Sequence, residues 1–395
     1  MDKQNFIKEY AVDRHNSNSY KWDDLKNRFG KDDLISMWIA DMDFKTSNKI
    51  IESMIERIKN GVFGYSFLPN EYYIAFSKWM VERHKLELDK EWIRFSTGVV
   101  TSISWMINAF TQEEDACLIL TPVYPPFHNT ITNNNRRLVT VDLINNNGYF
   151  TMDYEEIEKV IAENKIKMFI HCSPHNPVGR VWKEKELEKI FDICKKYNVL
   201  IVSDEIHQDI ILKEHKFIPA MLVENGKYND NLIVLSSASK TFNLAGLIHS
   251  HILIYNEDLR NKYDNYIKRI NRTEVNIIGA IATQTGYEHG KEWLENILEI
   301  IQNNYEYMKS EFEKKASEIV ISPLEGTYLV FINLQGYIKA ENIKDFIQNK
   351  CNLAVNYGET FGENFGGFIR LNLATNPEYI KIAVKNILTE IKKLK

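Results

Sequence analysis

Hydrophobic residues in the first two thirds of the chain form short β-branched runs, and longer amphipathic stretches separate these runs. Five runs have the length of buried strands, at 117–121, 137–143, 167–172, 199–203 and 232–236. Between the third and the fourth run, Leu187, Ile190, Phe191 and Cys194 recur at helical spacing within 183–197. This repeated strand–helix–strand order predicts a mostly parallel sheet that helices cover on both faces.

The last third of the chain has a different pattern. Residues 292–318 and 378–394 are expected to form helices, and 327–334 and 367–374 are expected to form strands between them. This α+β order indicates a second, smaller domain. We expect a large domain at 47–286 and a small domain that combines 1–46 with 287–395, although no Gly/Ser-rich linker marks the boundaries.

The composition is that of an ordinary globular protein, with 395 residues, 44% hydrophobic and 26% charged. The formal net charge of -5 arises from interspersed charges, whereas a nucleic-acid surface needs a concentrated basic stripe. Cys117, Cys172, Cys194 and Cys351 form no CxxC pair, which favours reduced, buried thiols over metal binding. Without a signal-peptide pattern or ~20 consecutive apolar residues, the chain is expected to be cytoplasmic and not membrane-bound.

Polar residues with useful chemistry follow several of the predicted strands. Tyr124, Asn176, Asp204 and Lys240 each come within a few positions of a strand end. In parallel α/β sheets, ligand-binding residues gather just beyond the carboxyl ends of the strands. We therefore expect these four residues in the ligand-binding region.

Lys240 stands in the octet SSASKTFN, after a β-run and among small hydroxyl residues. Lysine normally lies at the surface, so this octet alone fits a solvated loop lysine as well as a buried one. In a cleft, desolvation and neighbouring cationic groups would make its amine nucleophilic, which suits Schiff-base chemistry.

Two more segments carry candidate groups. In IVSDEIH, Asp204 could be a helix N-cap, or it could be a carboxylate that keeps a pyridine nitrogen protonated. In CSPHNPVG, two prolines restrict the backbone around Asn176, and Gly179 permits an unusual turn. This segment fits a rigid strand-to-helix loop, and it also fits an amide that is held for a hydrogen bond to a cofactor.

The order and spacing of these motifs resemble the fold-type I aminotransferase superfamily of pyridoxal-phosphate (PLP) enzymes. NPxG, SDEI and SxSK occur in that order, and the lysine follows the aspartate by thirty-six residues. The segments WIADMDF (38–44), GY (64–65), TPVY (121–124) and GFIRLN (367–372) resemble its MalY/PatB branch, whose members are cystathionine β-lyases or C–S lyases. The resemblance implies a seven-stranded, mostly parallel sheet between helices, a smaller α+β domain, and a homodimer with shared active sites.

The resemblance also implies a role for each motif residue. Lys240 would hold PLP as a Schiff base and move the substrate's α-proton, and Asp204 would pair with the pyridine nitrogen. Asn176 would bond the phenolic oxygen, near which His207 stands in place of a tyrosine that many relatives carry. Tyr124 would stack on the ring, although a loop tyrosine packed on the core is an equally simple interpretation.

The phosphate is expected in a cup of neutral donors. Val99 and Val100 lie in TGVVT, which leads into a predicted helix, and backbone amides at a helix N-terminus favour an anion. By resemblance, Ser237 and Ser239 would add hydroxyl donors. Tyr65 would reach in from the partner subunit.

Two further positions bear on anion binding. Many aminotransferases have an arginine eight positions after the lysine, but Ile248 stands there in this chain. Arg370 lies in a predicted apolar strand and needs a partner, which could be an acidic side chain or, as the resemblance implies, the substrate's α-carboxylate. Ala40 and Asn176 are also expected to bind substrate.

The motif residues do not separate two reactions of an α-amino acid, because transamination and β-elimination use the same lysine, aspartate and arginine. Resemblance to the lyase branch predicts PLP-dependent β-elimination of cystathionine or cysteine S-conjugates, which gives a thiol, pyruvate and ammonia. An aminotransferase that uses 2-oxoglutarate with aromatic or other amino acids is the alternative. A regulatory binding protein is a more distant one, because some family members bind a transcription regulator.

Overall fold

The computed structural model describes residues 2–271 and 275–394, and a seven-stranded sheet of order β2-β10-β9-β8-β7-β3-β4 forms its centre. The strands are β2 (Ile93–Ser96), β3 (Ala116–Thr121), β4 (Arg137–Asp142), β7 (Met168–Cys172), β8 (Leu200–Asp204), β9 (Leu232–Ser236) and β10 (Ser250–Leu253). β10 runs antiparallel to both neighbours, and the other pairs are parallel. The predicted mostly parallel sheet is confirmed, and the five predicted strands are β3, β4, β7, β8 and β9.

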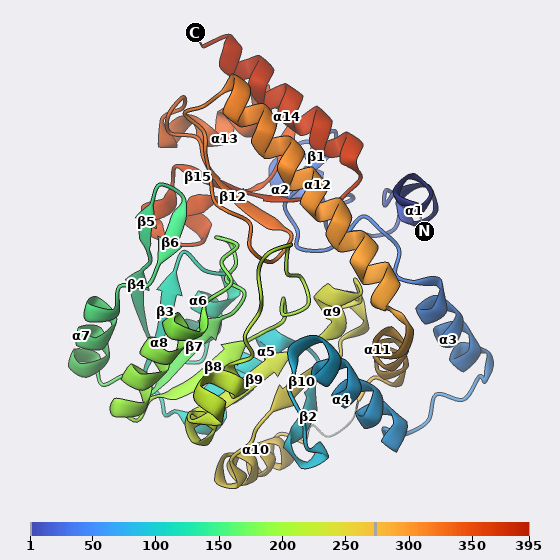
Figure 1. Ribbon diagram of the computed structural model, residues 1–395, viewed down its shortest axis with the longest axis vertical. Helices are drawn as coiled ribbons and strands as arrows, with labels where there is room; N and C mark the ends of the chain where they lie inside the picture. The colour runs from blue at the N-terminus through green and yellow to red at the C-terminus, as the bar shows by residue number, and fades with distance from the viewer. Residues whose placement is uncertain (1, 272–274, 395) are drawn as a thin grey trace.

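Alternate residues of the central strands face opposite helical layers. In β3, Cys117 and Ile119 belong to one hydrophobic cluster, and Leu118 and Leu120 belong to the other. Because both faces are covered, β3 and β9 consist almost entirely of apolar residues. The predicted amphipathic helix is α8 (Glu184–Lys196), which packs on one face, whereas α5 (Val99–Phe110), α6 (Pro126–Asn133) and α10 (Glu257–Arg269) pack on the other (Figure 1).

The remaining helices surround this sheet or belong to the chain ends. They are α1 (Lys3–Tyr10), α2 (Leu25–Phe29), α3 (Asn48–Lys59), α4 (Asn70–His84), α7 (Tyr154–Asn164), α9 (Ala238–Thr241), α11 (Ile277–His289), α12 (Lys291–Lys315), α13 (Ile343–Asp345) and α14 (Pro377–Lys392). α9 is a single turn that follows β9 directly, and it carries Lys240.

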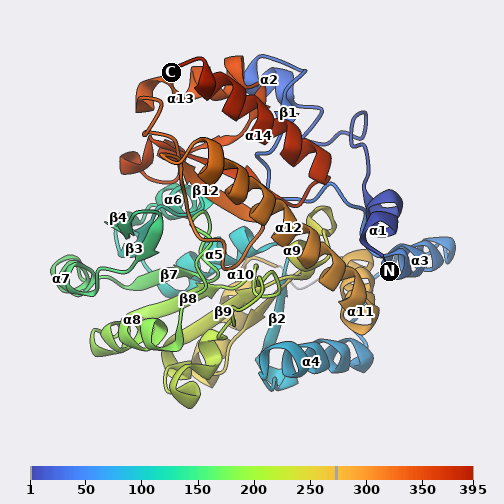
Figure 2. The ribbon, with the colours of Figure 1, turned by 45° about the horizontal axis from the view of Figure 1, so that its top comes forward.

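The N-terminal segment that carries α2 and β1 (Ile35–Ser36) lies beside the C-terminal helices α13 and α14 on one side of the large sheet (Figure 2). A four-stranded antiparallel sheet contains β11 (Val320–Ile321), β12 (Leu329–Asn333), β15 (Phe368–Asn372) and β14 (Asn356–Tyr357), and β5 (Ile144–Asn146) pairs with β6 (Tyr149–Thr151) in a separate ribbon. β1 (Ile35–Ser36) pairs in parallel with β13 (Leu353–Ala354). This pairing joins the N-terminal segment to the C-terminal portion. The domain boundaries at 46/47 and 286/287 remain a prediction, and the second of them falls within α11.

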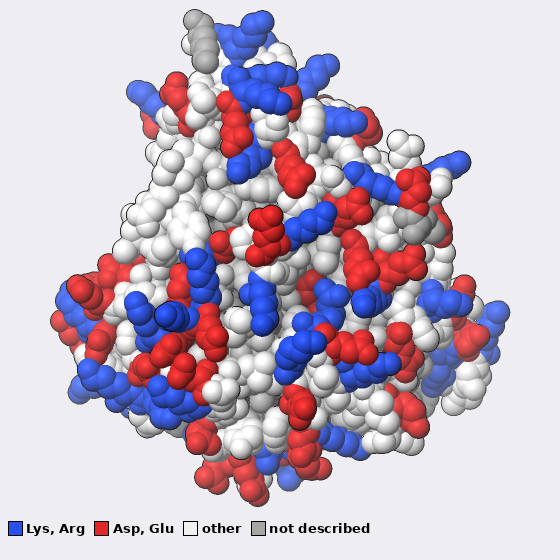
Figure 3. All heavy atoms as spheres, viewed as in Figure 1, with Lys and Arg blue, Asp and Glu red and all other residues white. Residues whose placement is uncertain are grey.

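The surface shows both signs of charge interspersed over the face in Figure 3. None of the described helices combines the length and the apolar character needed to cross a membrane. All four cysteines are free and buried, as predicted. The cytoplasmic location remains a prediction.

Candidate active site

A cavity of about 190 Å³ opens at the carboxyl ends of the parallel strands. Its lining comprises Ala40, Gly98, Val99, Val100, Thr101, Tyr124, Cys172, Asn176, Asp204, Ile206, His207, Ser239, Lys240 and Ala245. The strands β3, β7, β8 and β9 are neighbours in the sheet, so the residues that follow their ends come together here. Nine of the residues predicted for the site line this one cavity.

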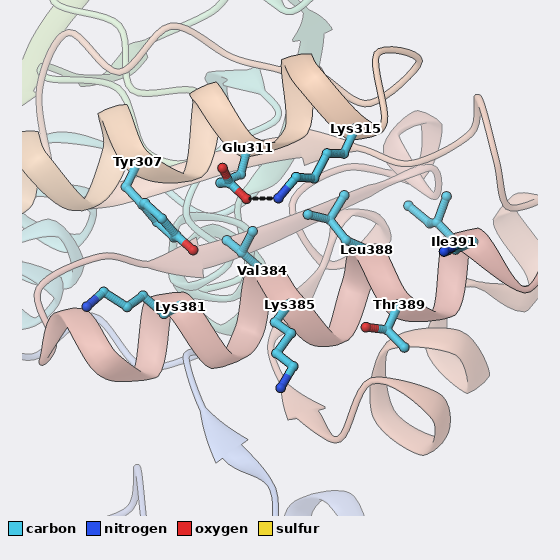
Figure 4. Close-up of a pocket in the computed structure, with 10 residues that line it drawn as sticks. Tyr307, Glu311, Lys315, Lys381, Val384, Lys385, Leu388, Thr389 and Ile391 are labelled. Atoms are coloured by element: carbon cyan, nitrogen blue, oxygen red, sulfur yellow. Dashed lines mark hydrogen bonds and ion pairs between the residues drawn. The ribbon is translucent and has the colours of Figure 1, made fainter.

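Larger hollows lie elsewhere, and Tyr65 is the single predicted site residue that borders one of those described. One of about 670 Å³ lies between α12 and α14. Figure 4 shows that Glu311 pairs with Lys315 along α12, while Val384 and Leu388 face them from α14. The size of a hollow therefore does not identify the site in this protein, and the chemistry of the lining residues does.

Lys240 is half-buried, and its Nζ donates a hydrogen bond of 2.6 Å to the carbonyl oxygen of Ala40. Burial lowers the pKa of the Lys240 amine to about 8. The carboxylates of Asp41 and Asp204 oppose this shift, and the Arg370 guanidinium reinforces it. The amine is therefore partly neutral at physiological pH and can act as a nucleophile or a base. The alternative of a solvated loop lysine is wrong.

Asp204 is the last residue of β8 and is 5% exposed. Its Oδ1 accepts a hydrogen bond of 3.0 Å from the backbone amide of Ile206, and it forms no ion pair with another described residue. A turn follows β8, so the helix N-cap alternative is wrong. Burial raises the pKa of Asp204 to about 7, although the Ile206 amide and the charge of Lys240 lower it. A cationic partner in the cavity would stabilise the charged form of this carboxyl group.

Arg370 lies in β15 and is 4% exposed. Its guanidinium donates to Oδ1 of Asn176 (3.0 Å), to Oδ1 of Asn356 (2.6 Å) and to the carbonyl oxygen of Trp38 (2.8 Å). These acceptors are neutral, Nε has no partner, and no described carboxylate forms an ion pair with Arg370, so the acidic-partner alternative is wrong. Burial lowers the pKa of Arg370 to about 10. An uncompensated guanidinium in this position is suited to a carboxylate ligand.

The backbone of residues 38–44 is fixed against the site by side chains from distant parts of the chain. Asn372 donates two hydrogen bonds of 2.6 Å to carbonyl oxygens of this segment, and Asn243 donates two more, of 3.0 and 2.9 Å. The hydroxyl of Tyr328 donates to the carbonyl oxygen of Ala40 at 2.8 Å, beside the bond from Lys240. The segment therefore forms one rigid wall of the cavity.

The expected phosphate donors differ in position. The first residues of α5, Val99 and Val100, border the cavity, and so does Ser239. Ser237 does not line it, because its hydroxyl donates to the carbonyl oxygen of His249 at 2.7 Å and accepts from the Ser239 amide at 3.0 Å. Ser237 therefore supports Ser239 from behind. Ile248 is 52% exposed and also lies outside the lining.

The aromatic residues predicted for the site lie in two environments. Tyr124 is half-buried in the lining, and buried His207 meets the ring of Tyr328 edge-on at 5.6 Å. Burial lowers the pKa of His207 far below its usual value, so its ring is neutral. Tyr65 is fully exposed and borders a different hollow between α4 and α11. Its role depends on a partner subunit and stays a prediction.

Sequence reasoning missed two residues that shape the site. Tyr328 falls within the predicted strand 327–334, and no motif marks it. Asn356 lies opposite Arg370 in the register of β14 and β15, and no motif marks it. The position of Asn356 beside Arg370 follows from the register of two short strands, which is known only from the folded chain.

The polar groups at the cavity fit PLP. Among the described residues, Asp204 has no cationic partner, and Arg370 and His207 each have a buried nitrogen without a hydrogen-bond partner. Burial lowers the pKa of the Lys240 amine to about 8. A pyridine nitrogen, a substrate carboxylate and an aldehyde are the groups that such residues complement. The fold and this site define a PLP-dependent enzyme of fold type I.

Comparisons with known proteins agree. The model of the family described as aminotransferase class I and II matches residues 32–387, and the chain belongs to this family. Cystathionine beta-lyase PatB of Bacillus subtilis is 31% identical over 361 residues, which cover 91% of this chain and 93% of that protein. The structure of a PLP-bound putative aminotransferase from Clostridium difficile 630 has a TM-score of 0.93 and 38% identity, and the match covers 98% and 99% of the two chains. The structure of cystalysin from Treponema denticola, which contains PLP, has a TM-score of 0.93 and 32% identity, and the match covers 98% of each chain.

Proposed function

We propose that this chain is a PLP-dependent carbon–sulfur β-lyase that acts on cystathionine or cysteine S-conjugates and releases a thiol, pyruvate and ammonia. The observation that carries the proposal is the uncompensated Arg370 guanidinium near the amine of Lys240, an arrangement that suits an α-amino acid. Similarity to a cystathionine beta-lyase over 91% of the chain favours cleavage of a C–S bond.

Each polar residue would contribute one function. Bound PLP supplies an electron sink that stabilises negative charge on the substrate's α-carbon. Lys240 would hold the cofactor, Asp204 would face its pyridine nitrogen, and Asn176 would face its phenolic oxygen. Ser239 and the first amides of α5 would bind the phosphate without help from an arginine.

Two residues would act directly on the substrate. Arg370 would orient it by binding the α-carboxylate through two parallel hydrogen bonds. The Nζ of Lys240 would accept the proton from the α-carbon, because a pKa of about 8 leaves part of the amine unprotonated at neutral pH. The carbonyl oxygen of Ala40 would keep this amine in place, since it accepts a hydrogen bond from it in the structure.

The deciding experiment is an assay of the PLP-loaded protein with L-cystathionine, in which pyruvate and free thiol are measured with and without 2-oxoglutarate. We expect both products at equal rates without the keto acid, and none from Lys240→Ala. Glutamate formation that requires the keto acid, with no thiol, would refute the lyase and establish an aminotransferase. The observation that favours this second candidate is the similarity of the chain to the putative aminotransferase from Clostridium difficile 630.

An exposed apolar patch outside the cavity favours a homodimer. Large apolar side chains are exposed together on the segment before α4: Val62 (66%), Phe63 (63%), Tyr65 (101%) and Phe67 (83%). Such a patch is typical of a surface that a partner covers. We propose that a second copy covers it and that Tyr65 then enters the partner's cavity.

Subunit complementation tests this arrangement. Lys240→Ala and Tyr65→Ala proteins should each have little activity alone. After equal amounts are unfolded and refolded together, the mixture should regain up to about a quarter of the parent activity. About half of the dimers are then hybrids, and each hybrid has one intact site of two. No recovery, together with a solution mass of one chain, would refute the shared site.

A further inference from the structure

A buried carboxylate outside the cavity collects four donors from two parts of the chain. Asp209 is 1% exposed and accepts hydrogen bonds from Nε1 of Trp79 (3.1 Å), Nε2 of His84 (2.8 Å) and Oγ1 of Thr241 (2.7 Å). Nε of Arg83 forms an ion pair with the same carboxylate at 3.2 Å. Three of these donors belong to the end of α4, but Thr241 belongs to α9 and follows Lys240 directly.

The position of Thr241 connects this cluster to the amine of the cavity. α9 is one turn long, so its own hydrogen bonds are too few to fix it, and its anchors must come from outside. Thr241 is fully buried and is tied to Asp209 on one side. On the other side, Asn243 bonds the wall at 42–44, and the ring of Phe242 packs so tightly on α11 that a Cβ added at Gly286 would lie 2.5 Å from it.

The segment between Asp204 and Asp209 is also stiff. The amide of Gln208 donates to the carbonyl oxygen of Glu205 at 2.9 Å, and the amide of Ile210 donates to that of His207 at 2.9 Å. These successive turns set the distance between the two aspartates. Asp209 therefore links the helix of Lys240 to Asp204, which would face the pyridine nitrogen.

We propose that Asp209 is a positioning residue that fixes Lys240, through the hydroxyl of Thr241, relative to Asp204. The proposal rests on the proposed function, because it concerns the lysine that would hold PLP and move the α-proton. Displacement of a reacting group by about 1 Å can cost on the order of 10²-fold in rate, so a carboxylate that touches neither cofactor nor substrate can still control the reaction.

Two variants of Thr241 separate the hydroxyl from the packing of its methyl group. Thr241→Val keeps the branched shape and removes the donor to Asp209, whereas Thr241→Ser keeps the donor and removes the methyl group. Asp209→Asn tests the carboxylate itself, and Thr241→Val answers the question if that variant does not fold. The visible-range circular dichroism of bound PLP is recorded without substrate at equal cofactor occupancy, and kcat and KM are then measured with L-cystathionine.

For Thr241→Val we expect weaker dichroism, because a loosened lysine holds the ring less asymmetrically. We also expect kcat to fall by ~10- to 100-fold with KM changed by less than about threefold, since the loss is in placement of the amine and not in substrate binding. Thr241→Ser should retain the dichroism and the kcat of the parent.

Equal losses in Thr241→Val and Thr241→Ser would overturn the proposal, because packing would then explain them. A lower kcat with unchanged dichroism, or no change in either, would also overturn it. The dichroism needs no substrate, so it still tests Asp209 if the protein proves not to be a C–S lyase.

Discussion

Replacement of Asp204 by asparagine should stabilise the cofactor-free protein at neutral pH, although it should abolish the proposed activity. Burial raises the pKa of this carboxyl group from 3.8 to about 7. Between these two pH values the folded chain binds more protons at this group than the unfolded chain does. The contribution of Asp204 to the free energy of unfolding therefore falls as pH rises through this window. Asparagine carries no charge, and its Oδ1 can still accept from the amide of Ile206.

The size of the effect follows from the shift. A difference of about 3 pH units is worth about 4 kcal/mol at 1.36 kcal/mol per unit, as an upper bound. We expect Asp204→Asn to exceed the parent by about 2–4 kcal/mol above pH 7 and by only about 1 kcal/mol at pH 4.5. Urea unfolding of both cofactor-free proteins at pH 4.5, 6, 7 and 8 measures this difference.

Asp33→Asn is the matched control, because it makes the same chemical change at an exposed carboxylate outside the cavity. A difference between Asp204→Asn and the parent that stays constant from pH 4.5 to 8 would refute the reasoning. So would a variant that is less stable than the parent at pH 8. Addition of PLP should reverse the order at pH 8, since only the parent can pair a carboxylate with the pyridine nitrogen.

Two further predictions concern binding and the backbone. Arg370→Lys should lower kcat/KM for cystathionine by about 10- to 100-fold, because one charge-assisted hydrogen bond is worth about 1.5–3 kcal/mol. Arg94→Lys, at a half-buried arginine outside the cavity that pairs with Asp264, should leave kcat/KM unchanged, and steady-state kinetics measures both. Gly179→Ala should lower the free energy of unfolding by about 1–2 kcal/mol for its φ of +72° and by more for a Cβ placed 2.9 Å from Leu324. Gly30 has a φ of +77° and no atom within 4 Å of an added Cβ, so Gly30→Ala should show the loss due to backbone conformation alone. Thermal unfolding of both variants and the parent measures the two losses.

The central strands could be predicted because their burial leaves a local signal. A strand covered on both faces is a continuous apolar run, as β3 and β9 are, and such runs stand out in the sequence. The two-residue pairing of β1 with β13 has no such signal, because its partners are more than 300 residues apart and each is too short for a pattern.

The site divides in the same way. Lys240, Asp204 and Asn176 follow strands that are neighbours in the sheet, so order along the chain was enough to bring them together. Ser237 shows the limit of that reasoning. It stands two residues from the cavity-lining Ser239, and yet its hydroxyl donates to the carbonyl oxygen of His249, the residue just before β10. Which of two nearby hydroxyls faces a ligand depends on side-chain direction, which residue spacing does not give.

Unpaired charge distinguishes the proposed site from the rest of the interior. Other buried charges among the described residues are paired: Lys21 bonds Asp43 at 2.8 Å, and Arg180 bonds Glu325 at 2.9 Å.

Lys240, Asp204 and Arg370 have no such partners among the described residues, and burial shifts the pKa of each toward its neutral form. Glu205 shows that burial alone is not the criterion. Burial raises its pKa to about 8, but its Oε1 accepts from Ser203 and from a backbone amide, and it lies outside the cavity lining. Lys240 and Asp204 line the cavity, and Arg370 lies behind its lining residue Asn176, to which it donates a hydrogen bond. Three such groups of both signs at one place make sense only if ligands supply the opposite charges, as PLP and an amino acid do.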